Sequence, residues 1–294
     1  MHYPLTAETF AALWGDRHGT DKNAPDSPNS PDTPDSSDTA DFWNRRAPSF
    51  NAHMREKPSR QRRRDLVQHL LQKTGVRPSA TVLDIGCGSG AHALELAPLT
   101  HWVEGLDIAP AMIDLARENA LQDGCRNVNF RVLDWADANL SVLGWQKAFD
   151  LVLAIRTPAL RSAAALAKMQ AASRQACGII THVQMRHSVR DALQKYVHWD
   201  AARMRMTNGF YCAFNILWLE GRYPEVEYLD QAWERTYPLE EARRMHLHYF
   251  ESSAPLTVEQ RHNLEQALED MSVDGTIHEK VQTKLAVMLW RTEE

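Results

Sequence analysis

Hydrophobic positions recur with two periods along this chain of 294 residues. Short apolar or alternating runs, which are typical of strands, occupy residues 81–85, 102–108, 128–133, 149–155, 177–185, 225–235 and 281–291. Apolar residues three or four positions apart, which are typical of amphipathic helices, occupy segments 6–16, 41–57, 59–75 and most stretches between the strands. This alternation of strands and helices predicts an α/β fold with seven strands.

Residues 20–40 break both patterns. Pro25, Pro28, Pro31 and Pro34 recur at every third position among Asp, Ser, Asn and Thr, a composition typical of a solvated, disordered linker. We therefore expect an N-terminal helical segment (1–19), a disordered linker (20–40) and one large domain (41–292).

Composition narrows the class of protein. At 44% hydrophobic and 24% charged, the chain can bury a sizeable core, and its net charge of −5 gives no overall attraction to nucleic acid. The four cysteines form no C-x-x-C pair, which favours reduced thiols in a cytoplasmic protein. Neither a signal peptide nor a run of 18 apolar residues is present, so no membrane association is expected. The histidines form no H-E-x-x-H motif, and we expect no metal site.

The most informative stretch is a strand followed by a glycine loop. Val82, Leu83 and Ile85 are the apolar strand residues, and glycines follow at positions 86, 88 and 90 before a helix expected at 91–97. Asp84 stands at the end of the strand. The pattern Asp-x-Gly-x-Gly-x-Gly resembles motif I of the class I S-adenosylmethionine-dependent methyltransferases. With Ala91 in the third place, the same loop also matches the dinucleotide pattern G-x-G-x-x-G/A, so an NAD(P)-dependent oxidoreductase is the alternative.

Acids at the ends of two later strands favour the resemblance to a methyltransferase over the oxidoreductase alternative. Asp107 follows the second strand about twenty residues after Gly86, where both families bind ribose hydroxyls. Asp134-Trp135 follows the third strand and resembles motif III of the methyltransferases, whose acid meets the adenine amino group. Asp84 would repel a pyrophosphate but would attract the amino group of S-adenosylmethionine.

The resemblance implies a Rossmann-like, mostly parallel seven-stranded sheet with helices on both faces and an antiparallel last strand. It divides the domain into a helical lid (41–75), a cofactor-binding core (80–186), a helical cap (187–222) and C-terminal strands and helices (225–292). It implies an enzyme that transfers a methyl group from S-adenosylmethionine by in-line displacement. The cofactor residues it implies are Asp84, Gly86, Cys87, Gly88, Gly90, Asp107, Ile108, Met112, Asp134, Trp135 and Ala154.

The acceptor is expected to be a small molecule, and the sequence names only candidates for its site. Substrate contacts are expected from Trp43, Phe50, Arg156, Tyr211 and Trp218, although the aromatic residues would equally suit packing in the core. His182 and His187 are candidates for taking a proton, with Arg156 as a third catalytic candidate that would hold an anionic group.

Arginines concentrated between residues 45 and 64 form a basic patch in an otherwise acidic chain. A solvated face is the favoured interpretation, and an RNA methyltransferase that uses this patch is an alternative. A non-catalytic cofactor-binding subunit is a further alternative, and the pattern indicates no particular oligomeric state.

Overall fold

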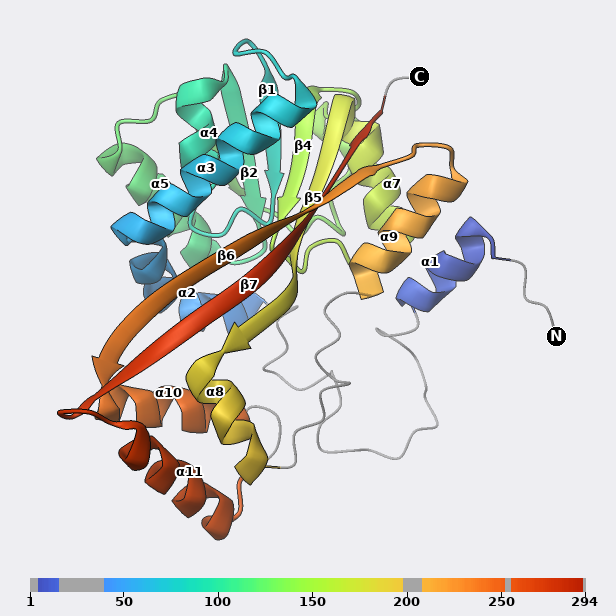
Figure 1. Ribbon diagram of the computed structural model, residues 1–294. Helices are drawn as coiled ribbons and strands as arrows, with labels where there is room; N and C mark the ends of the chain where they lie inside the picture. Colours follow the sequence, from blue (N-terminus) through green and yellow to red (C-terminus); the bar gives the residue numbers. More distant parts are fainter. Residues whose placement is uncertain (1–4, 16–39, 198–207, 252–254, 293–294) are drawn as a thin grey trace.

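The computed structural model describes residues 5–15, 40–197, 208–251 and 255–292. The linker predicted at 20–40 lies outside the described residues, except for Ala40, which begins a helix. One sheet of seven strands has the order β3-β2-β1-β4-β5-β7-β6 (Figure 1). The strands are β1 (Thr81–Ile85), β2 (Trp102–Asp107), β3 (Val128–Val132), β4 (Phe149–Ile155), β5 (Ser173–His187), β6 (Glu225–Pro238) and β7 (Thr276–Arg291). Strands β1 to β5 pair in parallel, and β7 runs antiparallel to both β5 and β6. The predicted fold class is confirmed.

The helices of the described residues connect these strands. They are α1 (Ala7–Gly15), α2 (Ala40–Arg55), α3 (Lys57–Thr74), α4 (Ala93–Leu96), α5 (Pro110–Gln122), α6 (Leu140–Leu143), α7 (Ala163–Ala172), α8 (Ser188–Leu193), α9 (Asn208–Leu219), α10 (Leu239–Glu251) and α11 (Val258–Met271), with short 3-10 turns η2 (Ala97–Leu99) and η3 (Gln194–Tyr196). Gly75 ends α3 in the left-handed conformation that glycine adopts most readily. Within the described ranges, no helix has the length and apolar character that a membrane crossing requires.

The period of two along each strand sends neighbouring side chains to opposite faces of the sheet. In β1, Val82 packs into a cluster with α3, α4 and α5, whereas Leu83 packs into a cluster with α1, α7 and α9. In β4, Leu151 packs into the same cluster as Val82, and Val152 into the same cluster as Leu83. The central strands are therefore buried on both sides, as their nearly continuous apolar sequences predict (Figure 1).

The last three strands are much longer than the others. Strands β5, β6 and β7 have 15, 14 and 16 residues, and they extend past the central sheet to α8, α10 and α11 (Figure 1). Along β7, burial alternates from residue 276 to 284 and is continuous from 285 to 290. The first half of β7 is thus covered on one face, and the second half on both. We call α8, α10, α11 and the strand ends beside them the distal lobe, which has a hydrophobic cluster of its own.

Two segments differ in detail from the sequence predictions. The helix expected at 91–97 is reduced to α4 and η2, because the left-handed turn extends through Gly90 and Pro98 limits the helix at its other end. The segment 187–222, expected to form one cap, is divided. Helix α8 joins the distal lobe, α9 packs against α1 and α7, and residues 198–207 lie outside the described residues.

Candidate functional site

The glycine loop after β1 has a backbone that other residues would adopt only with strain. Gly86, Gly88 and Gly90 all have positive φ angles, of 68°, 55° and 77°. A Cβ atom on Gly86 would lie 1.9 Å from the Oγ1 atom of Thr157, and one on Gly88 would lie 3.4 Å from the ring of Phe50. The loop is therefore enclosed by the end of β4 on one side and by the lid helix α2 on the other.

Asp107, at the end of β2, is held by the backbone of two loops. Its carboxylate accepts hydrogen bonds from the N–H groups of Gly88, at 3.0 Å, and Ala109, at 2.9 Å. Burial raises the pKa of Asp107 despite these hydrogen bonds, which lower it. The bonds fix the direction of the carboxylate at the carboxyl edge of the sheet.

Asp134, at the end of β3, has a partner that the sequence did not suggest. Arg161 Nη2 lies 2.7 Å from Asp134 Oδ2, and the N–H of Ala136 donates to Oδ1 of the same carboxylate at 2.9 Å. The indole of Trp135 is fully buried and donates a hydrogen bond to the carbonyl of Ala165 at 3.1 Å. Asp134 is therefore oriented by an ion pair, and Trp135 by packing under the sheet edge.

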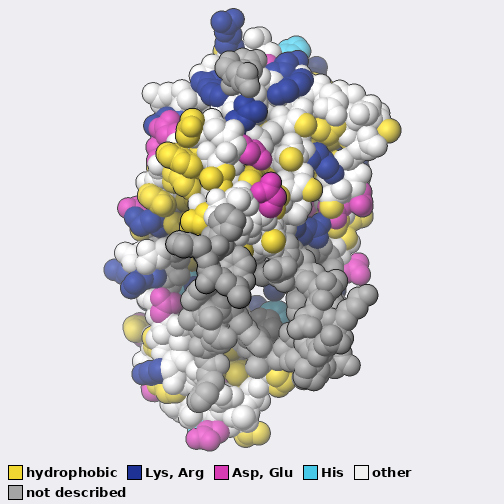
Figure 2. All heavy atoms as spheres, turned by 90° about the vertical axis from the view of Figure 1, so that its right-hand side faces the viewer, with side chains coloured by type: hydrophobic (Ala, Val, Ile, Leu, Met, Phe, Trp, Pro, Cys, Tyr) yellow, Lys and Arg dark blue, Asp and Glu magenta, His cyan; other side chains and the backbone are white. Residues whose placement is uncertain are grey.

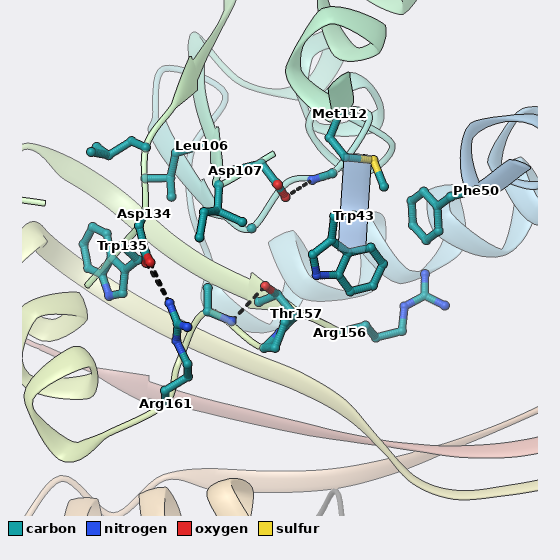
Figure 3. Close-up of a pocket in the computed structure, with 16 residues that line it drawn as sticks. Trp43, Phe50, Leu106, Asp107, Met112, Asp134, Trp135, Arg156, Thr157 and Arg161 are labelled. Atoms are coloured by element: carbon teal, nitrogen blue, oxygen red, sulfur yellow. Dashed lines mark hydrogen bonds and ion pairs between the residues drawn. The ribbon is translucent and has the colours of Figure 1, made fainter. Parts of the chain in front are cut away.

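These elements enclose a first cavity of about 600 Å³ at the carboxyl ends of the parallel strands, where ligands bind in open α/β sheets (Figure 3). The predicted cofactor residues that line it are Gly86, Gly88, Asp107, Ile108, Met112, Asp134 and Trp135, and the predicted substrate residues are Trp43, Phe50 and Arg156. Figure 3 shows Arg161 beside Asp134, whereas Arg156 lies at the other end of the cavity, near Phe50.

Asp84 lies beneath the glycine loop and does not line the first cavity. Its side chain is buried, 1% exposed, and its Oδ2 atom has no hydrogen-bond partner. Burial, together with the charge of Asp107, raises the pKa of Asp84 to about 7. A buried carboxylate without a full set of partners is costly, so this position favours a cationic group nearby. Cys87, Gly90 and Ala154 were also predicted to contact the cofactor, and they lie behind the cavity wall.

The other substrate candidates lie on α9. Tyr211 is 59% exposed and contacts Phe10 edge to face, while Trp218 stacks on Phe214. In Figure 2, which views the side of α1 and α9, hydrophobic side chains gather on the upper part of this face. The structure therefore does not bring Tyr211 and Trp218 to the first cavity.

His182 lines a second cavity, of about 610 Å³, which shares Arg156 with the first. Its Nδ1 atom lies 2.6 Å from Thr283 Oγ1, and that hydroxyl donates to the carbonyl of Gln184 at 2.9 Å. Because a hydroxyl has one proton, Nδ1 must be the donor to Oγ1, and Nε2 retains its lone pair. Burial, and then the charge of Arg156, lowers the pKa of His182 to about 4, so the ring is neutral at pH 7.

His187 is outside both cavities. Its Nδ1 atom lies 3.4 Å from Glu279 Oε1 at the junction of β5 with the distal lobe. Arg235 also binds Glu279, whose side chain is fully buried. These contacts are those of a structural ion-pair cluster. Within the described part of the chain, no group of three or more His, Cys, Asp or Glu side chains is arranged to hold a metal ion.

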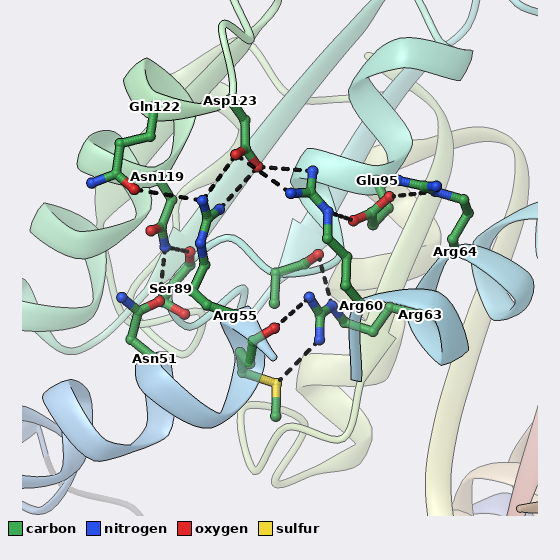
Figure 4. Close-up of polar contacts among 12 residues, drawn as sticks. Asn51, Arg55, Arg60, Arg63, Arg64, Ser89, Glu95, Asn119, Gln122 and Asp123 are labelled. Atoms are coloured by element: carbon green, nitrogen blue, oxygen red, sulfur yellow. Dashed lines mark hydrogen bonds and ion pairs between the residues drawn. The ribbon is translucent and has the colours of Figure 1, made fainter. Parts of the chain in front are cut away.

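The basic patch differs from the solvated face that the sequence favoured (Figure 4). Arg55 and Arg60 both bind Asp123 with nitrogen–oxygen distances of 2.9 Å, and Arg60 also binds Glu95 at 2.7 Å. Arg64 binds the other oxygen of Glu95 at 3.2 Å. Three arginines of the patch thus form an ion-pair network that attaches the lid helices α2 and α3 to α4 and the end of α5.

Several lining residues escaped the sequence analysis. Arg161 and Leu133 flank Asp134, and Thr157 closes the glycine loop. Thr157 follows the end of β4, so its place in the chain was a usable signal. Arg161 offered none, because its pairing with Asp134 joins residues 27 positions apart through a loop.

Parts of this chain are similar in sequence to known methyltransferases. A family model described as "Methyltransferase domain" matches residues 77–240, more than half of the chain. Aklanonic acid methyltransferase DauC of Streptomyces is 41% identical over 75 residues, which are 24% of this chain and 32% of that protein. The 23S rRNA (uracil(1939)-C(5))-methyltransferase RlmD of Klebsiella pneumoniae is 35% identical over 89 residues, 30% of this chain and 20% of that protein. The chain therefore spans less than a third of the length of either relative.

Among solved structures, the YcgJ protein of Bacillus subtilis is similar with a TM-score of 0.44 and 14% identity, over 78% of this chain and 98% of that one. The match of the family model over residues 77–240 agrees with the glycine loop and the acids at successive strand ends. By that match, this chain belongs to the methyltransferase domain family, as the sequence resemblance implied.

Proposed function

We propose that this protein methylates a small molecule that binds in the second cavity, next to S-adenosylmethionine held in the first. The observation that best supports this proposal is that Arg156, at the end of β4, lines both cavities, so the two cavities are neighbours. S-adenosylmethionine supplies an electrophilic methyl group on a cationic sulfur. The work of the protein is to align the two molecules and to exclude water.

The described residues fit the donor. The oriented carboxylate of Asp107 suits the ribose hydroxyls, and Asp134 suits the adenine amino group although it also binds Arg161. The orphaned carboxylate oxygen of Asp84 suits the cationic amino group of the methionine moiety. Trp43 and Phe50, which contact each other edge to face, cover the first cavity and would shield the reaction from water.

His182 is our candidate for the proton acceptor. Its Nδ1–H is occupied by Thr283, and its ring lines the second cavity with the lone pair of Nε2 available. A hydroxyl or amine acceptor would lose a proton as it gains the methyl group, and a neutral imidazole takes such a proton.

A small acceptor fits better than RNA. Three arginines of the basic patch, Arg55, Arg60 and Arg64, are engaged with Asp123 and Glu95, which reduces the charge that this face offers to a phosphate backbone (Figure 4). The relatives' names include a methyltransferase of aklanonic acid and one of 23S rRNA, so both acceptor classes occur among the matches. The pairing of these three arginines, together with the enclosed position of the second cavity beside the first, favours a small acceptor in our proposal.

Calorimetry and labelled-methyl transfer test the proposal. The protein should bind S-adenosylhomocysteine and ignore NADH, and it should label a low-molecular-weight fraction of a cell extract. NADH binding alone would contradict the donor assignment. Label in the RNA fraction, with a steep loss of binding as salt rises, would instead identify an RNA methyltransferase. Tight binding with no labelled product in any fraction would identify a non-catalytic subunit.

A further inference from the structure

Arg156, at the end of β4, combines a rare backbone conformation with a position between the two cavities. It has a φ angle of 50°, a left-handed conformation that a non-glycine residue rarely adopts, and its N–H donates to the carbonyl of Ile180 at 2.7 Å. Backbone strain of this kind tends to persist where it serves a site. Here it turns the side chain at the end of β4 into the wall between the two cavities.

The charge of Arg156 has no acidic partner among the residues that the structure describes. Its Nη2 atom lies 3.2 Å from Nε2 of His92, a buried ring whose pKa burial and then Arg156 lower well below its usual range. Burial, together with the charges of Arg63 and Arg62, lowers the pKa of Arg156 itself to about 10. Because a cation that is largely withdrawn from water is normally paired, the half-buried Arg156 favours an anion supplied from outside the chain.

Two more arginines line the second cavity beside it. Arg63 is 5% exposed and donates to two backbone carbonyls, those of Met54 at 2.7 Å and Ala91 at 3.2 Å. Arg62 places its guanidinium 4.7 Å from the ring centre of Trp233 on β6. Glu95, whose charge acts on Arg63, is engaged by Arg60 and Arg64, and the acid whose charge acts on Arg62 is Glu56, which lies 3.3 Å from Nδ1 of His53. The residues that line the cavity include three arginines and no acid, so the wall itself carries an excess of positive charge.

Apolar groups form another part of the wall, beside the polar side chains of His53, Ser59 and Gln231. Trp233, Met185 and Leu285 project from the long strands β5 to β7, opposite the arginines of the lid helix α3. A ligand that suits both sides has an apolar or aromatic body and an anionic end.

We propose that the second cavity selects acceptors that carry an oxyanion, a carboxylate or a phosphate, bound by Arg156 and Arg62 with the apolar body against Trp233. This inference rests on the proposed function and names the substrate class for it. In the methyl transfer, a lone pair of the acceptor's hydroxyl or amine forms the new bond to the methyl carbon. The carbon–sulfur bond breaks with its electrons remaining on sulfur, and the acceptor's proton passes to His182 Nε2.

One other source of an oxyanion is the carboxylate of the methionine moiety of S-adenosylmethionine, because Arg156 also lines the first cavity. A pair of ligands separates the two sources. S-adenosylhomocysteine carries that carboxylate, whereas 5′-methylthioadenosine lacks it. If Arg156 serves the acceptor, R156Q should change the affinities for these two ligands by the same small factor. A selective loss for S-adenosylhomocysteine would overturn the proposal.

The direct test uses 2-naphthoate and its uncharged counterpart 2-naphthamide, with binding to the protein saturated with S-adenosylhomocysteine measured by saturation-transfer NMR. We expect 2-naphthoate to bind at least tenfold more tightly than the amide. R156Q and R62Q should each abolish this preference, and R126Q, which changes an exposed arginine outside both cavities, should retain it. Equal affinities for acid and amide, with S-adenosylhomocysteine still bound, would overturn the anion site alone. Failure to bind S-adenosylhomocysteine would overturn the proposed function instead.

Discussion

His182 on β5 places its Nδ1 atom 2.6 Å from the hydroxyl of Thr283 on β7. The register of the two strands shifts between His182 and Gln184, and Thr283 bonds to both residues across this irregularity. Bulges often redirect a side chain next to an active site. The pair thus sets both the tautomer and the direction of the ring at the wall of the second cavity.

Replacing Thr283 with valine should therefore disturb His182 without changing the volume of the core. Without the oxygen, Nδ1–H loses its acceptor, and we expect a mixture of tautomers in long-range ¹H–¹⁵N NMR spectra. Labelled-methyl transfer should fall by about tenfold or more, since a positioned base contributes at least that much. T236V is the matched control, because Thr236 bonds to Nδ1 of His278 at 2.9 Å in an exposed position. A T283V protein with full activity and an unchanged tautomer would remove His182 from the mechanism.

Substitution of Asp107 by asparagine should weaken the binding of S-adenosylhomocysteine by about tenfold or more. The amide would set an N–H group against the N–H of Gly88 or Ala109, and it would lose the charge that suits ribose hydroxyls. Calorimetry measures the effect. The exposed Asp137 supplies the control D137N, which should bind normally. Equal affinities of the two variants would refute the ribose assignment.

Alanine at Gly86 should be much more harmful than alanine at Gly124. The two glycines have nearly the same φ angle, 68° and 67°, so each substitution carries the left-handed penalty of about 1–2 kcal/mol. Only at Gly86 would the new Cβ collide with Thr157, since nothing lies within 4 Å of the corresponding position at Gly124. Urea unfolding gives the shared penalty, and the additional loss in G86A, together with weaker S-adenosylhomocysteine binding, gives the effect of the collision. Identical free energies of unfolding for G86A and G124A would show that the glycine loop moves away from Thr157 at no cost.

The arginine network should stabilise the fold. In D123N, Arg55 and Arg60 lose the charge of a shared partner whose side chain is 11% exposed, and we expect a loss of about 1–3 kcal/mol in the free energy of unfolding. D114N removes an exposed carboxylate paired with Arg117 and should change stability little. Comparable stability of D123N and the unchanged protein in urea would mean that the ion pairs of Asp123 do not hold the lid helices in place.

Acid should weaken the distal lobe through Glu279. Burial alone would raise the pKa of this carboxyl, but the hydrogen bond from His187 and the charge of Arg235 lower it from 4.5 to about 2. Because the folded-state pKa is depressed, the stabilisation is complete above pH 4.5 and is lost as the pH falls toward 2. Urea unfolding followed by circular dichroism should show a loss on the order of 2 kcal/mol over this range. E279Q should flatten this pH dependence, whereas E234Q, at an exposed position of β6, should preserve it.

The glycine loop and the acids after β1, β2 and β3 were predictable because their signal is local. Each strand is a short apolar run, and each acid follows its strand directly in the chain. Parallel strands end at one edge of the sheet, so the order of the chain already brings Asp107 and Asp134 to the first cavity. The length of β7 was underestimated, because its outer part contains a charged residue, Glu279, that is buried in ion pairs.

The sequence by itself determined the family, the fold and the edge of the sheet at which the first cavity lies, since strand periodicity and adjacency along the chain suffice for these. Only the tertiary structure decided what surrounds the acceptor. His182 and Thr283 are 101 residues apart, and Arg60 and Asp123 are 63 apart. Their contacts depend on strand register and on how the lid helices dock, which arise from packing across the whole molecule. The same packing placed Tyr211 and Trp218 on a helix beside α1, because an aromatic helix face carries no local sign of what it will cover.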